Sequence, residues 1–198
     1  MRSIPTFDDA AAFHGHVCPG LALGYRVALA ALERLGNTPA DDEEIVCIVE
    51  NDTCAVDAVQ VVTGCTFGKG NLIFLDHGKQ AYTFYNRADG RGIRIYADAY
   101  YIGDADDTRF LELANAGRPF TGEELQEFRS IRERRVRDIL SRAEEDFMTV
   151  SLPRELLPRP AQIRTSVVCD GCGERVMDSR ITMFDGRAFC LTCLNGLK

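Results

Sequence analysis

Two histidines and a cysteine lie within five positions of each other in the segment FHGHVCPG, residues 13–20. His14, His16 and Cys18 occupy alternating positions, and the whole chain has only three histidines. If this segment is extended, side chains two residues apart point to the same side, so the three heads converge. Imidazole and thiolate are good ligands for zinc and other borderline transition metals. A helix that begins near Gly20 would place its positive end beside the cysteine, which favours a thiolate, either as a metal ligand or as a nucleophile.

A second polar set lies on an otherwise apolar segment, CAVDAVQVVT, which spans residues 54–63 and is typical of a buried helix. Cys54, Asp57 and Gln60 are spaced three residues apart, so they share one helix face. Polar groups on so apolar a helix need partners, and the segment 13–20 would supply them. The sequence therefore predicts a site shared by the two segments, with Cys65 as a further thiol. The alternative is a surface histidine pair and small buried cysteines.

The remaining cysteines form the firmest pattern in the chain. Cys169 and Cys172 are followed, after seventeen intervening residues, by Cys190 and Cys193. Four thiolates at this spacing suit a tetrahedral zinc ion, and the intervening residues read as a small hairpin before a short final helix. This order of knuckle, hairpin and helix predicts a treble-clef zinc finger. Redox-active pairs or disulfides are the alternative.

The loop TFGKGN, residues 66–71, only loosely resembles a phosphate-binding loop because it lacks the full P-loop pattern. Lys69 could contact an anionic substrate or cofactor from this loop. The alternative is a glycine-rich turn with an exposed lysine.

The elements that must position these residues follow from periodicity and from turn residues. We expect helices at 20–35, 54–63 and 121–147, the last opened by a capping box of Thr121 and Glu124. Expected strands cover residues 45–49, 71–76, 79–86 and 91–98. These elements predict an α+β core at residues 1–148, a proline-rich linker at 149–165 and a zinc-finger domain at 166–198.

Composition narrows the class of protein. The chain has 198 residues and a net charge of −7, which argues against broad binding to nucleic acid. The sequence has neither a signal-peptide pattern nor an apolar run of the roughly 18 residues that a membrane span needs. We therefore expect a soluble, cytoplasmic protein without a membrane partner.

These segments together resemble the FmdE family, named for a component of formylmethanofuran dehydrogenase. The matching stretches are HGHVCPGLALGYR (14–26), CAVDAVQVVTGCTFGKGNL (54–72), DHGKQAYTF (76–84), and CDGCGE (169–174) with CLTC (190–193). One position departs from the family pattern, because His77 stands where another aromatic residue is more typical.

The resemblance implies a mixed α+β core, a treble-clef finger and a homodimer. The family name points to methanogenesis, and to a molybdenum or tungsten oxidoreductase that forms formylmethanofuran from CO₂. On this basis we expect His16 and Cys18 to bind a second transition metal together with Cys54 or Cys65. His14 would be a ligand or a proton shuttle. Asp57 would orient the metal ligands through hydrogen bonds without binding the metal itself.

Two other classes of function stay open on the sequence. The protein could be a non-enzymatic module that carries a metal and docks a partner through its finger. Nucleic-acid binding through the finger is the least favoured class, because of the acidic charge.

Overall fold

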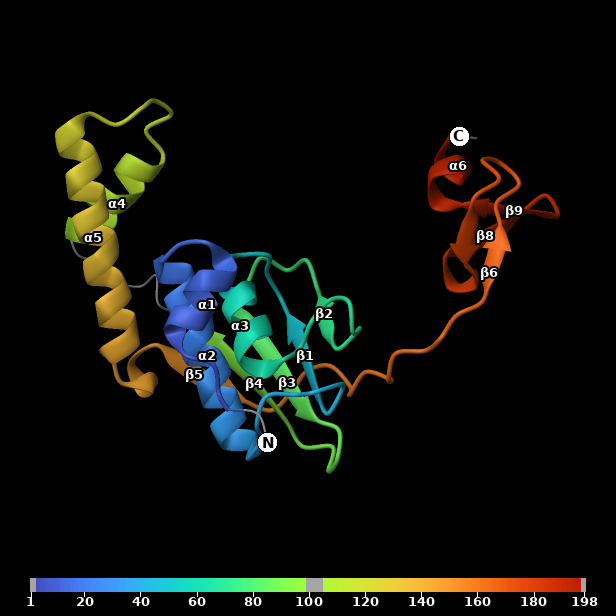
Figure 1. The fold of residues 1–198 in the computed structure, drawn as a ribbon, viewed down its shortest axis with the longest axis horizontal. Coiled ribbons are helices and arrows are strands. Elements are labelled where there is room, and N and C mark those ends of the chain that lie inside the picture. Colours follow the sequence, from blue (N-terminus) through green and yellow to red (C-terminus); the bar gives the residue numbers. More distant parts are fainter. Residues whose placement is uncertain (1–2, 99–104, 197–198) are drawn as a thin grey trace. The chain divides into compact units, whose positions relative to one another are not determined.

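The computed structural model describes residues 3–98 and 105–196, apart from the side chains of residues 105–107. The chain divides into two compact units, Met1–Pro160 and Ala161–Lys198 (Figure 1).

A five-stranded sheet forms the centre of the first unit. Its spatial order is β2-β1-β3-β4-β5, in which β1 and β2 are parallel and every other pair is antiparallel. The strands span β1 (Ile45–Val49), β2 (Leu72–Phe74), β3 (Ala81–Asn86), β4 (Gly92–Ala97) and β5 (Met148–Ser151). All five residues of β1 are buried, as expected for a central strand rich in β-branched residues.

Three helices lie on one side of this sheet: α2 (Pro19–Leu35) and α3 (Ala55–Thr63), with α1 (Phe7–His14) packed against both of them (Figure 1). The main core lies between the sheet and α2, where buried side chains from both meet, among them Leu23, Val27, Leu32, Phe84 and Ile95. Each helix ends at a glycine with positive φ, which only glycine adopts without strain: Gly15, Gly36 and Gly64.

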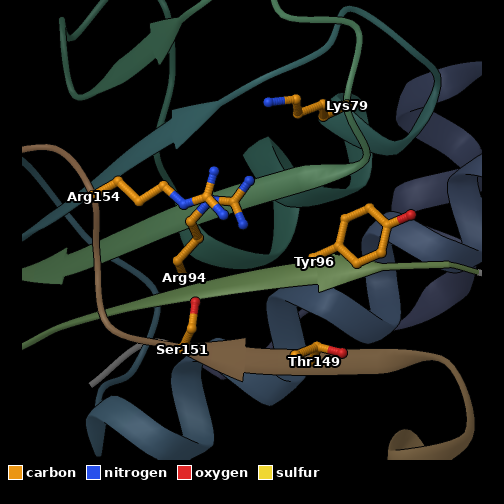
Figure 2. Close-up of a pocket in the computed structure, with 6 residues that line it drawn as sticks. All are labelled: Lys79, Arg94, Tyr96, Thr149, Ser151 and Arg154. Carbon is orange, nitrogen blue, oxygen red and sulfur yellow. The ribbon is translucent and has the colours of Figure 1, made fainter.

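The opposite face of the sheet is partly covered by a segment without helical structure. Residues 152–160 run back across it, where Leu157 packs on Val46 and Ile48. The hydroxyl of Tyr85 donates to the backbone carbonyl of Glu155, which ties this segment to β3. The rest of the face, over β4 and β5, stays open (Figure 2).

Two further helices, α4 (Ala105–Ala114) and α5 (Gly122–Ser141), form a hairpin held by stacked phenylalanine rings, with the centroids of Phe110 and Phe128 4.8 Å apart. The C-terminal end of α5 packs against α2. There the guanidinium of Arg26 donates to the carbonyls of Ile139, Leu140 and Arg142, which a helix end otherwise leaves without partners.

The second unit is small. It contains a hairpin of β6 (Ser166–Val168) with β7 (Arg175–Met177) and a second hairpin of β8 (Ile181–Phe184) with β9 (Arg187–Cys190). The helix α6 (Leu191–Asn195) follows directly, with Cys190 as its N-cap.

The α+β class is confirmed, as are the helix from Pro19 and the strand at 45–49. Two expectations need correction. The long helix stops at Ser141 rather than 147, because Arg142 adopts an extended conformation. Residues 149–151, assigned to the linker, belong to β5, where edge pairing with β4 satisfies their backbone. The helix α4 lies where no element was expected.

Candidate metal centres

The first centre lies where three helix ends meet. His14 is the last residue of α1, Cys18 is the N-cap of α2, and Cys54 is the N-cap of α3. One donor atom from each of these residues lies within 4.8 Å of the others, an arrangement that can hold a metal ion. Small apolar residues pack around it, including Ala10, Leu21 and Ala58.

Asp57 decides the state of the His14 ring. Nδ1 of His14 lies 2.7 Å from Oδ2 of Asp57, and the histidine side chain is only 11% exposed. Because an ionised carboxylate only accepts hydrogen bonds, the ring proton sits on Nδ1. Nε2 faces away from Asp57 and lies 3.8 Å from the Cys18 sulfur, so in the neutral ring it is the nitrogen that offers a lone pair there. The amide of Gln60 donates to the other oxygen of Asp57 at 3.3 Å. The prediction that these two residues share one face of α3 is therefore confirmed.

The Cys18 sulfur experiences two opposing influences. Burial raises the pKa of its thiol to about 11, while the backbone amide of Leu21, 3.4 Å away, acts in the other direction. The nearby Cys54 thiol contributes to the same raised pKa, since two thiolates repel each other. A bound cation would remove both obstacles, because it compensates the negative charge of the two sulfurs.

Gly24 allows this convergence. A Cβ atom at this position of α2 would lie 2.0 Å from the backbone oxygen of Ala55, so only glycine fits. The close approach of α2 to α3 brings their N-cap residues, Cys18 and Cys54, near each other.

The structure selects among the residues that the sequence proposed. His14 joins the cluster, whereas the more exposed His16 lies outside it with its ring centroid 4.5 Å from that of His14. The expected extended run from 14 to 18 does not form, because His14 is helical and Gly15 turns the chain in the left-handed region.

Cys65 and Lys69 also lie away from the cluster, because both follow the C-terminal end of α3, whose nine residues rise by about 14 Å. The Cys65 thiol is fully buried and donates to the carbonyl of Ile45. The Lys69 ammonium lies 3.4 Å from the carbonyl oxygen of Asp41, in a glycine-rich turn.

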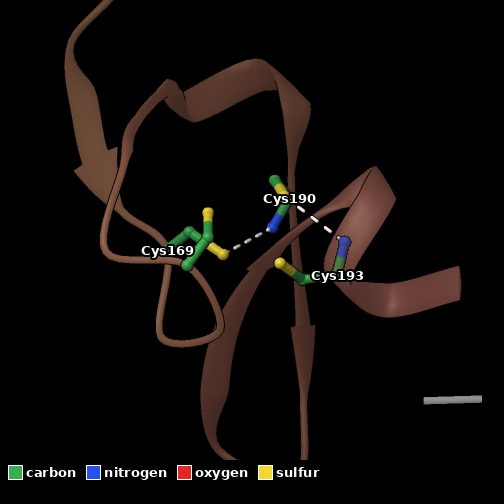
Figure 3. A group of neighbouring side chains, drawn as sticks. Cys169, Cys190 and Cys193 are labelled. Atoms are coloured by element: carbon green, nitrogen blue, oxygen red, sulfur yellow. Dashed lines mark hydrogen bonds between the residues drawn. The ribbon is translucent and has the colours of Figure 1, made fainter. Parts of the chain in front are cut away.

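The second centre is the four-cysteine cluster of the second unit, where Cys169, Cys172, Cys190 and Cys193 offer sulfurs that all lie within 4.8 Å of one another. Backbone amides point at these sulfurs, as Figure 3 shows for the amide of Cys190 at 3.2 Å from the sulfur of Cys169. Gly171 is required here, since a Cβ would lie 2.9 Å from the Cys193 sulfur.

The thiols of this cluster lose their protons unequally. The amide of Cys190 is the main cause that lowers the pKa of Cys169 to about 6. Hydrogen bonding with the Cys190 thiol raises the pKa of Cys193 to about 12. A cation is therefore needed to hold all four as thiolates, and the donor set is compatible with a zinc finger.

The described helices include none with the length and apolar character needed to cross a bilayer.

Comparison with known proteins identifies the family of this chain. The model of a family described as "FmdE, Molybdenum formylmethanofuran dehydrogenase operon" matches residues 13–149. The chain belongs to the FmdE family.

Two known proteins are similar to this chain. The FmdE-family chain is similar to the crystal structure of a tungsten formylmethanofuran dehydrogenase FmdE-like protein from Syntrophus aciditrophicus, with a TM-score of 0.61, 26% identity and 98% coverage of both chains. It is also 36% identical, over 91% of its length, to a probable S-adenosyl-L-methionine-binding protein of Archaeoglobus fulgidus. The chain spans about half of that curated relative, 50% of its length.

Proposed function

We propose that this FmdE-family protein binds one transition-metal ion in its first unit, through His14, Cys18 and Cys54. We further propose that it serves as a metal-binding subunit or accessory protein of formylmethanofuran dehydrogenase, or of a related redox enzyme of one-carbon metabolism. The observation that carries the metal site is the hydrogen bond from His14 Nδ1 to Asp57, because it leaves Nε2 facing the Cys18 sulfur in a cluster that also holds Cys54.

The donor set fits a borderline metal such as zinc. One imidazole and two thiolates are ligands of the kind and number found in catalytic zinc sites, which keep a fourth position for water or substrate. A metal bound there would act as a Lewis acid. Asp57 would hold the imidazole tautomer and the ring orientation, and Gln60 would in turn hold Asp57.

In the second unit we propose a structural zinc ion on the four cysteines, since a unit this small lacks the core to fold unaided. Its exposed apolar side chains, which include Met183, Phe184 and Leu191, favour protein contact over nucleic-acid binding. A cytoplasmic homodimer follows as a proposal from family membership.

A metal-carrying role without turnover is the alternative for the first unit. Rapid transfer of the core metal to a chelator, with the finger metal retained, would favour a carrier. Slow release would favour a resident cofactor.

The test compares two neighbouring histidines, His14 at the end of α1 and His16 just beyond it. We expect the full chain to hold two metal ions, and His14→Ala to hold one, by elemental analysis per chain. His16→Ala is the matched control and should keep both. Equal metal content in the two variants would contradict the assignment of His14.

A thiol nucleophile is a second candidate, favoured by the geometry Cys18–His14–Asp57, in which a base lies 3.8 Å from the sulfur and is oriented by a carboxylate. Rapid alkylation of Cys18 by iodoacetamide in the metal-free protein at neutral pH would support it. We expect slow alkylation, since burial holds the thiol protonated.

A further inference from the structure

A cationic pocket lies on the open face of the sheet, on the side opposite α1, α2 and α3. It has a volume of about 370 Å³ and is lined by six polar side chains: Lys79, Arg94, Tyr96, Thr149, Ser151 and Arg154 (Figure 2). Three of these carry positive charge and none is acidic, although the chain as a whole has a net charge of −7.

Strand register places the lining side chains. Arg94 pairs with Ser151 across β4 and β5, and two residues further along Tyr96 pairs with Thr149. Side chains two residues apart share a face of a sheet, so the guanidinium, the phenol ring and two hydroxyls project together. The sequence alone could not show this, because β5 follows β4 only after the α4–α5 hairpin.

Arg94 is held in place before any ligand binds. It is only 5% exposed, and its Nε and Nη2 atoms lie 2.8 and 2.7 Å from Oε1 of Glu50 beneath the pocket. Burial opposes the charge of Glu50, but hydrogen bonds from Arg94 and His77 outweigh it and lower the pKa of Glu50. An arginine fixed in this way loses little conformational entropy on binding.

The other two cations extend the site. The backbone amide of Lys79 donates to the carbonyl of Glu50, and the side-chain amide of Asn51 donates to the carbonyl of Lys79, which fixes the start of this side chain. Figure 2 shows the guanidinium of Arg154 reaching toward that of Arg94. Within the described residues, neither Lys79 nor Arg154 forms an ion pair. Arg94 already has its counter-charge in Glu50, so the guanidinium of Arg154 adds a positive charge that a bound anion would balance.

We infer that this pocket binds a small ligand through a phosphate group. Two guanidinium groups, an ammonium and hydroxyls line one pocket, and a tetrahedral dianion has enough acceptors for donors from several directions. The partly exposed ring of Tyr96 offers an apolar wall for the organic part of a phosphate ester.

The experiment titrates the full chain with inorganic phosphate and with phenyl phosphate at constant ionic strength, followed by ³¹P NMR line width. We expect saturable binding below about 10 mM, with phenyl phosphate tighter if the ligand is an ester rather than free phosphate. Arg154→Gln and Lys79→Gln, both at exposed positions, should each weaken binding by about tenfold with an unchanged thermal midpoint.

Arg159→Gln is the matched control, since this arginine is exposed in the same segment but does not line the pocket. It should leave binding unchanged. Three results would overturn the inference: no saturable binding of either phosphate, equal affinity in Arg154→Gln and the unaltered protein, or an equal loss in Arg159→Gln. Tighter binding of succinate than of either phosphate would also reject a phosphate ligand.

Discussion

A Cβ atom added to Gly24 would lie 2.0 Å from the backbone oxygen of Ala55, closer than any real contact allows. This glycine sits in the first half of α2, and Ala55 directly follows Cys54. The proximity of the two helices at this point is therefore linked to the proximity of Cys18 and Cys54. Packing in the core and the geometry of the first metal centre depend on the same contact.

Replacing Gly24 by alanine should force α2 and α3 apart. We expect a loss of about 1–3 kcal/mol in the free energy of unfolding, typical of overpacking, together with weaker metal binding in the first unit. Urea denaturation and elemental analysis would measure the two effects. Gly122→Ala is the control, because a Cβ there meets nothing within 4 Å. If the Gly24→Ala variant kept both its stability and its metal affinity, the proposed link between helix packing and the metal centre would be wrong.

Asp57→Asn should weaken the core metal site without emptying the finger. An asparagine can present its amide to Nδ1 of His14 and no longer selects the tautomer, and loss of such an outer partner typically costs 10–100-fold in metal affinity. Competition with a chromogenic chelator would measure the affinity. The exposed Asp52→Asn serves as control, and an equal decrease in both variants would show a nonspecific charge effect.

Glu50→Gln should destabilise the first unit by about 3 kcal/mol at pH 7, because it leaves the buried Arg94 without its counter-charge. The pKa of Glu50 is lowered in the folded protein, so its contribution is present above the unfolded value of about 4.3. That contribution disappears as the pH falls through the lower folded value.

The difference between the unaltered protein and the Glu50→Gln variant should therefore shrink as the pH falls below about 4. Urea midpoints at pH 7 and at acid pH would measure it, with the exposed Glu145→Gln as control. A difference that grows on acidification would reject the stated role of the ion pair.

Residues 1–160 should fold without the finger. Their core is contained within the first unit, and residues 152–160 complete its second face through Leu157 and the Tyr85 bond. We expect one cooperative thermal transition that a chelator does not abolish. A chain ending at Val150 should melt at a lower temperature, since it lacks that cover. Equal midpoints for the two truncated chains would show that the segment contributes nothing.

Local spacing was enough to predict the finger and most of the helices and strands. The four cysteines occur as two CxxC pairs. Because only two residues separate the members of each pair, their side chains are close in space as well as in sequence, so the spacing itself indicates a metal site. The helix from Pro19 follows equally from its apolar period and from Gly36 at its end. Such features depend on residues that are only a few positions apart in the chain, so they can be recognised in a single sequence.

Only the tertiary structure shows that His14 and Cys54, rather than His16 and Cys65, lie together with Cys18. The Asp57 carboxylate that selects His14 is 43 residues away in the chain, and α3 separates the two cysteines by its full length. The cationic pocket likewise depends on the pairing of Arg94 with Ser151 across two strands distant in sequence. A linear pattern shows which side chains are available, whereas helix packing and strand register determine which of them meet.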